Sequence, residues 1–429
     1  MSRSSILIAF VTITALCLPG AEAIAAGKQY SFENGSLTFG ATARIRTMSY
    51  SPTRFGIGGE NDSYTLYRAQ FSADLRWAEH WQAFTDIGAY DTVGRKGGPG
   101  SSGRSGPDLH QAYLGWSNPD YVLRLGRQEM AFGSNRLIDL RDGQNIRLAF
   151  DGIRAAKLLP ANGRVDVIAV RPVQSRSGSF DDRTDKNIGL WGVYASLVPA
   201  ATAPIKLDVY WLGYQRESAR FAEGAGREYR QSFGTRLHGN AAGFDWNSEV
   251  IWQNGRFADG DIQAWMIATD SGYTFQDAAW KPRLSLRANI ASGDKTPNDR
   301  RLQTFNSLFP KSSYYSQASL LAPANLVDIQ PAITVMPNER MQWTLGWDFA
   351  WKHRRADAVY TTPTPLTPLP GTAGGSKWIG QQIKLEGSWK LAPHWEARLH
   401  LAHFEVGSAI REAGGKNTNF VSTIIQFDW

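Results

Sequence analysis

Apolar and polar residues alternate with a period of two through most of this chain. The pattern is clearest in segment 341–351, whose apolar face consists of Met341, Trp343, Leu345, Trp347, Phe349 and Trp351. Successive side chains of a β-strand point to opposite faces, so this alternation predicts strands with one apolar and one polar face. Segments 36–50 and 64–77 repeat the pattern, with Arg44, Arg46 and Arg68 on the polar face.

The alternating segments predict about 18 strands, an even number of the kind found in bacterial membrane barrels. They begin near residues 36, 63, 81, 108, 121, 150, 163, 186, 204, 229, 244, 261, 281, 325, 341, 378, 395 and 417.

The connections between these segments alternate in length. Short turns are expected at 78–80, 117–120, 159–163, 198–203, 238–243, 336–340 and 390–394, with a longer one at 271–280. Long polar loops are expected at 51–62, 92–107, 129–149, 172–185, 215–228, 292–324, 352–377 and 405–416. Short periplasmic turns and long extracellular loops are typical of an all-β transmembrane antiparallel barrel, with apolar faces toward lipid. The alternative is a soluble β-sandwich, which also alternates.

The two ends of the chain indicate export and membrane assembly. Residues 1–23 combine Arg3, an apolar run of about 13 residues and a small-residue cleavage site, which predicts a signal peptide and not a spanning helix. Residues 24–429 are then a single β-barrel. The last segment alternates up to the terminal Trp429, as in outer-membrane barrels, so we expect the protein in the bacterial outer membrane.

Composition fits this prediction and excludes one class of chemistry. The chain has 16 Trp, 15 Tyr, 20 Phe and 42 Gly, an aromatic content that few sandwiches need. Cys17 is the only cysteine and lies in the predicted signal peptide, so disulfides, thiolate catalysis and cysteine–zinc sites are excluded from the exported chain. The net charge of +7 favours acidic partners only weakly.

One predicted loop, 129–149, is unusually rich in charge. Its charged residues are Glu129, Arg136, Asp139, Arg141, Asp142 and Arg147. A loop of this length exceeds what a hairpin needs and usually has a function of its own. We expect it to fold into the barrel mouth and to line a constriction, with Arg127 and Asp151 at its two ends.

The lumen is predicted to be basic. Because a cation on the lipid face at mid-membrane costs about 2–4 kcal/mol, mid-strand charges should point inward. Guanidinium groups bind carboxylates in a bidentate manner, so unpaired arginines near the narrowest point would favour anions. About half of these side chains would instead pair with carboxylates of the wall and only support the barrel.

Three segments resemble the alginate export family of outer-membrane β-barrels. They are DLHQAYLGW (108–116), RLGRQEMAFGSNRLI followed by FDGIR (124–138 and 150–154), and SGDKTPNDRRLQTFNSLFPKSSYY (292–315). The resemblance covers most of the exported chain and is densest at 108–154. It implies passive transport of an anionic polysaccharide, alginate or a similar uronate polymer or oligomer, through an arginine-rich pore.

The resemblance and the alternation together give the candidate pore residues. The charged residues of the family motif are Arg127, Arg136, Asp151 and Arg154. Lumen candidates from the strands and the loop are Arg44, Arg46, Arg68, Arg147, Arg230, Arg236, Arg283 and Arg287.

Two alternative functions stay open. The first is a less specific anion-selective porin for small organic acids. The second is a barrel enzyme or an adhesive surface protein, although the seven histidines include no HExxH motif and no phosphate-binding or dinucleotide fingerprint occurs. We expect no cofactor, no metal and no nucleic acid. The expected partners are the anionic polymer and outer-membrane lipid, with a periplasmic export or import machinery as a candidate, around a monomeric barrel.

Overall fold

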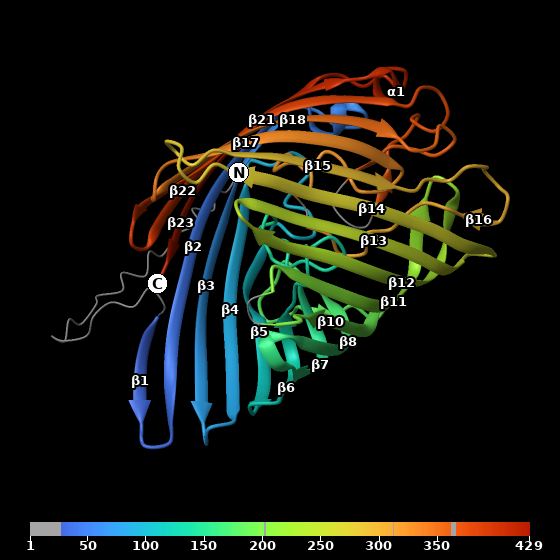
Figure 1. The fold of residues 1–429 in the computed structure, drawn as a ribbon. Coiled ribbons are helices and arrows are strands. Elements are labelled where there is room, and N and C mark those ends of the chain that lie inside the picture. The colour runs from blue at the N-terminus through green and yellow to red at the C-terminus, as the bar shows by residue number, and fades with distance from the viewer. Residues whose placement is uncertain (1–26, 201–202, 312, 362–365) are drawn as a thin grey trace, which may run out of the picture.

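Eighteen antiparallel strands close into a barrel in the computed structural model, which describes residues 27–200, 203–311, 313–361 and 366–429 (Figure 1). In order around the barrel they are β2 (Gly35–Ser51), β3 (Asp62–Trp77), β4 (Trp81–Val93), β5 (Ser105–Ser117), β6 (Tyr121–Glu129), β7 (Ala149–Leu158), β8 (Arg164–Gln174), β10 (Ile188–Leu197), β11 (Ile205–Phe221), β12 (Gly224–Ala241), β13 (Phe244–Phe257), β14 (Gly260–Thr274), β15 (Arg283–Ala291), β17 (Leu326–Asn338), β18 (Met341–Lys352), β21 (Trp378–Ala392), β22 (Trp395–Val406) and β23 (Thr418–Asp428). The predicted signal peptide, residues 1–23, lies outside the described residues.

The barrel closes between its first and last wall strands. β2 pairs with β3 along one edge and with β23 along the other, where Thr42 lies opposite Asp428. A short strand that the sequence did not predict, β1 (Lys28–Phe32), pairs with the remaining periplasmic part of β2, with Lys28 opposite Phe39. Closure gives each wall strand a partner on both sides, which lipid requires because it offers no hydrogen bonds.

The outer face of the wall is apolar, as the alternation predicts. On β18, Leu345 and Trp347 are 48% and 50% exposed on the lipid side. Asp348, the residue after Trp347, points inward and is buried. Near a periplasmic turn Trp77 lies opposite Trp81, and their rings stack with centroids 6.3 Å apart. Such tryptophans belong to the aromatic girdles that mark the two membrane interfaces.

One predicted loop is wrong. Residues 215–228 were expected to form a long extracellular loop, but β11 continues to Phe221 and β12 begins at Gly224, so the segment is an extended hairpin (Figure 1). This hairpin reaches beyond the lipid, where both faces meet water or other loops. Apolar alternation therefore stops although the backbone continues to pair.

The remaining elements are short and lie in the connections. They are η1 (Thr53–Gly56), η2 (Pro160–Asn162), β9 (Arg183–Thr184), β16 (Arg301–Leu302), β19 (Tyr360–Thr361), β20 (Thr367–Pro368) and α1 (Ser408–Arg411). Among the described residues, no helix has the length and apolarity to cross a membrane.

Two long connections meet at a shared backbone bridge and carry much of the apolar core. We call residues 130–148, between β6 and β7, the constriction loop, and the described residues of 292–325, between β15 and β17, the second loop. Ile138 of the first forms a parallel β-bridge with Phe309 of the second. The ring of Phe309 packs edge-on against Phe150 at 5.2 Å and Tyr214 at 5.8 Å, so loops and wall share one core.

An arginine placed on the lipid face should destabilise the barrel according to its depth. Leu345→Arg, midway along β18, should lower the free energy of unfolding by about 2–4 kcal/mol, whereas Met336→Arg, close to a periplasmic turn and 43% exposed, should cost about 0–1 kcal/mol. Urea titration of the vesicle-inserted protein, followed by heat-modifiable gel mobility, measures both. Equal destabilisation by the two variants would contradict the depth that we assign to these residues.

Candidate functional site at the barrel constriction

The constriction loop crosses the lumen between opposite walls. On one side it contacts arginines of β2 and β3, and on the other it contacts Glu249 of β13. In the order of strands around the barrel these two walls are separated by about half the circumference. The loop therefore lies inside the barrel and not over its mouth, as the sequence predicts.

Three buried arginines hold the near side of the loop by its backbone. Arg44 donates to the carbonyls of residues 142 and 144 at 2.6 and 2.7 Å, and Arg46 donates to the carbonyl of residue 143 at 2.5 Å. Arg68 donates to the carbonyls of residues 145 and 144 at 2.8 and 2.7 Å. A hydrogen bond from a charged donor contributes about 1.5–3 kcal/mol, so this arginine clamp fixes the loop firmly.

The carboxylate of Asp142 faces this clamp. Its oxygens lie 2.6 Å from the Arg68 guanidinium and 3.5 Å from that of Arg44. Both arginine side chains are 1% exposed, while the Asp142 side chain is 42% exposed toward the lumen. Burial alone would raise the pKa of Asp142, but the positive charges of Arg68 and Arg44 lower it below its usual value. The carboxylate therefore stays ionised and neutralises part of the clamp.

The far side of the loop is held by a second ion pair. Arg136 of the loop lies 2.5 Å from Glu249, and Ser134 donates to the same carboxylate oxygen at 2.6 Å. The other Glu249 oxygen accepts from Tyr210 of β11 at 2.6 Å. Both charged side chains are almost fully buried, so their pairing and hydrogen bonds are what make the burial tolerable.

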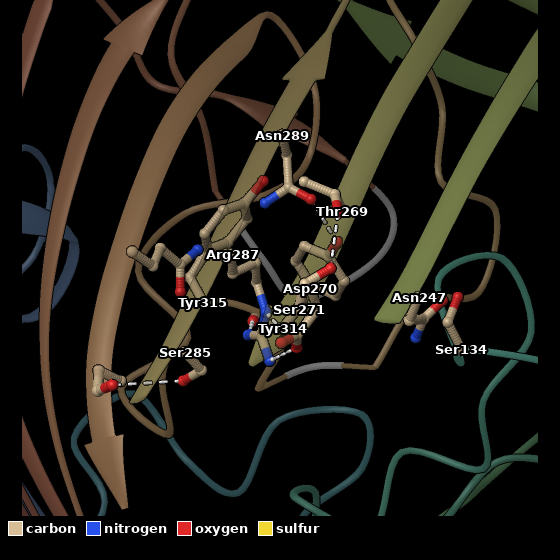
Figure 2. A network of polar contacts seen from close by, with 12 residues as sticks. Ser134, Asn247, Thr269, Asp270, Ser271, Ser285, Arg287, Asn289, Tyr314 and Tyr315 are labelled. Carbon is tan, nitrogen blue, oxygen red and sulfur yellow. Dashed lines mark hydrogen bonds and ion pairs between the residues drawn. The ribbon is translucent and has the colours of Figure 1, made fainter. Parts of the chain in front are cut away.

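The second loop packs against the first and against the wall from β15 to β21. Lys311 N–H donates to the carbonyl of Asn135 at 2.9 Å, which continues the bridge between the loops. The main-chain carbonyl of Tyr314 accepts a hydrogen bond from Arg287 at 2.8 Å. The hydroxyl of the Tyr314 side chain accepts one from Arg136 at 2.7 Å. Figure 2 shows Arg287 and Asp270 next to Tyr314 within this network. The phenol ring thus lies between two guanidinium groups, which are 5.7 and 5.5 Å from its centroid.

A cavity of about 310 Å³ lies beside these loops, along the strands from β13 to β21. We call it the lumen cavity. Its cations outnumber its carboxylates by five to three: Arg136, Arg283, Arg287, Lys311 and Lys384 against Asp270, Asp348 and Glu386. Arg283 and Arg287 remain 27% and 33% exposed although Asp245 and Asp270 accept from them. The residues that line the cavity are therefore net basic, while Asp245 and Glu249, which pair with Arg283 and Arg136, are not among them.

The opposite wall is different in charge. A cavity of about 360 Å³ between β2 and β5 is lined by Asp74, Asp86 and Asp428, and Arg147 is its only arginine or lysine among the described lining residues. Arg147 itself lies 2.7 Å from Glu129. The two cavities thus place positive and negative charge on opposite sides of the lumen.

The structure separates the twelve predicted pore residues into groups. Arg44, Arg46 and Arg68 form the clamp, Arg136 and Arg147 lie on the loop, and Arg283 and Arg287 line the lumen cavity. The wall contains the remaining ones in ion pairs: Arg127 with Asp151 at 2.8 Å, Arg154 with Asp166 at 2.7 Å, Arg236 with Asp208 at 2.7 Å, and Arg230 with Glu228 at 2.6 Å.

These wall pairs are spread around the barrel. The Arg230–Glu228 pair is fully buried, and the carbonyl of Thr304 in the second loop accepts from Arg230. Arg127 and Asp151 are on neighbouring strands, directly opposite each other in the register of β6 and β7. The structure therefore does not bring all twelve residues to one point.

Three important residues of the site were missing from the predicted set. Lys311 and Tyr314 belong to the second loop, inside the SGD…LFP…Y stretch that the sequence singled out only as a family feature. Lys384 alternates inward on β21 and its side chain is 10% exposed beside Asp348. Nothing local in the sequence reveals that the second loop turns inward, because Tyr314 contacts Arg287 and Asn289 of the wall, which are 27 and 25 positions away.

Comparison with known proteins gives one family and several structures of the same fold. The family model described as alginate export matches residues 36–423. No curated protein matches the chain. Acinetobacter baumannii OccAB1 superimposes with a TM-score of 0.61 at 11% identity, covering 92% of this chain and 96% of that chain.

Two Pseudomonas aeruginosa structures with ligands are similar to the same extent. OccK2 (OpdF) in complex with glucuronate gives a TM-score of 0.60 at 10% identity, over 91% of this chain and 97% of the other. OpdK with vanillate gives a TM-score of 0.57 at 10% identity, over 91% of this chain and 98% of the other. At such low identity these likenesses establish the fold alone.

Loss of one clamp arginine should loosen the constriction loop. Arg68→Met removes four hydrogen bonds of the guanidinium and should weaken the attachment of the loop by about 3 kcal/mol. In planar bilayers we expect a higher and noisier single-channel conductance. Arg76→Met on the same strand, 65% exposed beside Asp74, is the matched control and should leave the current trace unchanged. An unaltered trace in Arg68→Met would contradict the clamp.

Proposed function

Because this chain belongs to the alginate export family, we propose that it passes an anionic polysaccharide, alginate or a similar uronate polymer or oligomer, through a basic lumen. The protein is a channel of the bacterial outer membrane, as its family and its 18-stranded barrel establish. The substrate class and the lining residues are the proposed part.

The observation that carries the proposal is the excess of cations in the lumen cavity. Lys311 is exposed there and has no ion-pair partner among the described residues, while Arg283 and Arg287 keep exposed edges. A guanidinium can bind a second carboxylate in addition to its aspartate partner, since it has five N–H donors in a planar fork. Such shared contacts bind an anion weakly enough to release it, which conduction requires.

The clamp and the ion pairs of the wall support this role indirectly. Arg44, Arg46 and Arg68 are 1–3% exposed, so they reach a ligand through the field that they create and not by direct contact. We assign direct contact to Arg283, Arg287 and Lys311. Arg127, Arg154, Arg230 and Arg236 would act mainly as wall supports, since each has a carboxylate within 2.8 Å.

A second candidate is a channel for small organic acids. The lumen cavity of about 310 Å³ lies at the lower limit of small-molecule pockets, which favours one or two rings over an extended polymer. The glucuronate and vanillate complexes of OccK2 and OpdK show that barrels of this fold hold single-ring carboxylates. Both candidates use the same basic wall and differ in ligand length.

We further propose that the barrel acts as a monomer and without catalysis. The family is one of export channels, and this supports passive transport. A periplasmic export or import machinery remains a predicted partner, and the direction of transport follows from the gradient of the substrate.

Substitution of the exposed lumen cations should reduce anion selectivity. In Arg287→Gln and Lys311→Gln the chloride-to-potassium permeability ratio should fall by roughly two- to fivefold each, equivalent to about 0.5–1 kcal/mol for a solvent-exposed charge. Reversal potentials across a salt gradient give the ratio. Arg256→Gln, 83% exposed at the extracellular end of β13, is the control and should keep the wild-type ratio. Unchanged selectivity in both lumen variants would refute the basic-wall proposal.

Ligand length should separate the two candidates. If the polymer is the substrate, uronate oligomers from two to eight rings should block the current for longer times as the chain lengthens. A channel for small acids should instead respond to monomeric uronate, with no further gain from added rings. Single-channel block durations provide this comparison in one preparation.

A further inference from the structure

A separate cavity opens on the extracellular side of the constriction. It measures about 460 Å³ and lies between the outer ends of β2 and β3, the 94–104 loop, and the inward-folded loops. We call it the outer cavity. Its floor is formed by Arg46, residues 143–145 and Gln317. Arg46 donates to the carbonyl of Gly143 and to the side-chain oxygen of Gln317. A ligand that enters from outside meets this floor first.

The rim of the outer cavity is basic. Arg54, Arg95 and Lys96 line it and are exposed, while Asp62 is the only carboxylate among its described lining residues. Lys96 lies 2.8 Å from Glu60, but both side chains are more than half exposed, so this pair is weak. Arg54 and Arg95 have no ion-pair partner in the described chain. An incoming carboxylate therefore meets two guanidinium groups that have no carboxylate partner among the described residues.

One of these guanidiniums is held in place. Arg95 lies over the ring of Tyr64, 5.0 Å from its centroid, and donates to the carbonyl of Pro99 at 3.0 Å. Tyr64 is itself fixed by stacking on Tyr50 with centroids 6.4 Å apart. The cation–π contact orients the guanidinium before a ligand arrives, which lowers the entropic cost of binding.

The floor offers donors for hydroxyl groups. The side-chain amide of Gln144 makes no hydrogen bond within the described residues, and Gln317 uses only its oxygen, which accepts from Arg46 at 3.4 Å. Both glutamines are partly exposed. Amide N–H donors below guanidiniums that lack a carboxylate partner match a ring that carries one carboxylate and several hydroxyls.

We propose that the outer cavity is a capture subsite for one uronate ring at the extracellular mouth, distinct from the lumen cavity. This inference rests on the proposed function for its ligand class. The rim cations draw the anionic chain to the mouth and seat a terminal ring on the glutamine floor. The floor then separates capture from passage, since the basic lumen cavity lies beyond it.

Sidedness of block tests the subsite. A mannuronate tetrasaccharide is added to one face of a planar bilayer at a time, and the frequency of current block is measured. The extracellular face is identified with Ser218→Cys, an exposed position of β11, by a membrane-impermeant thiol reagent. In Arg54→Gln/Arg95→Gln we expect a roughly three- to tenfold lower block frequency from the extracellular face, because steering charge is lost. Block from the periplasmic face and the permeability ratio should stay unchanged.

The control is Arg104→Gln, which removes an exposed arginine from the same extracellular loop but outside the outer cavity. The tetrasaccharide should block this variant as often as it blocks the wild type. Heat-modifiable gel mobility confirms that each variant is folded. Equal block frequency in the wild type and the double variant overturns the subsite while leaving the lumen proposal intact. Absence of block from both faces in the wild type, together with no anion selectivity, overturns both.

Discussion

Charge inside a membrane barrel has to be paired or hydrogen-bonded, and the clamp of Arg44, Arg46 and Arg68 meets this requirement with backbone carbonyls. The three guanidiniums have almost no exposure to solvent. Burying their charge would cost much free energy if they lacked hydrogen-bond acceptors. The carbonyls of residues 142–145 accept six hydrogen bonds from them, and Asp142 supplies one countercharge. The constriction loop is therefore both the partner that the arginines need and the element that they position. The second loop, both inner cavities and the floor of the outer cavity all depend on that position.

The architecture follows from short-range patterns, whereas the site depends on long-range contacts. Strand alternation requires only neighbouring residues, so the predicted strand starts agree with the barrel to within a few residues for most strands. The clamp joins Arg44 to residue 142, which is 98 positions away, and Arg46 reaches Gln317 over 271 positions. No periodicity carries such information. The failure at 215–228 has a related cause, because the alternation reports contact with lipid and this hairpin extends beyond it.

We propose two roles for the arginines of this lumen, which the solvent exposure of their side chains distinguishes. The arginines of the clamp and of the Arg230–Glu228 pair are buried and hydrogen-bonded within the protein, so we propose that they mainly support the structure, and their predicted place in the pore stays a prediction. Arg283 and Arg287 also have aspartate partners, yet a quarter to a third of each side chain remains available to solvent. With acidic residues across the lumen, we propose that these groups set up a field that draws carboxylates to one wall. The path of an anion is thus expected to be off-centre.

Hydrogen bonds to main-chain carbonyls have a consequence for how such channels diversify. The Asn145 side chain is buried and donates to the carbonyls of Tyr67, Asp91 and Gly103. The clamp holds residues 143 and 144, in contrast, by main-chain carbonyls that every amino acid possesses, so side chains at these two positions are not required for the loop to stay in place. Mutations at these positions can change the size and polarity of the floor without displacing it. Specificity is thereby open to variation at a fixed scaffold position. We expect new substrate preferences to arise in this fold through single substitutions in the loop.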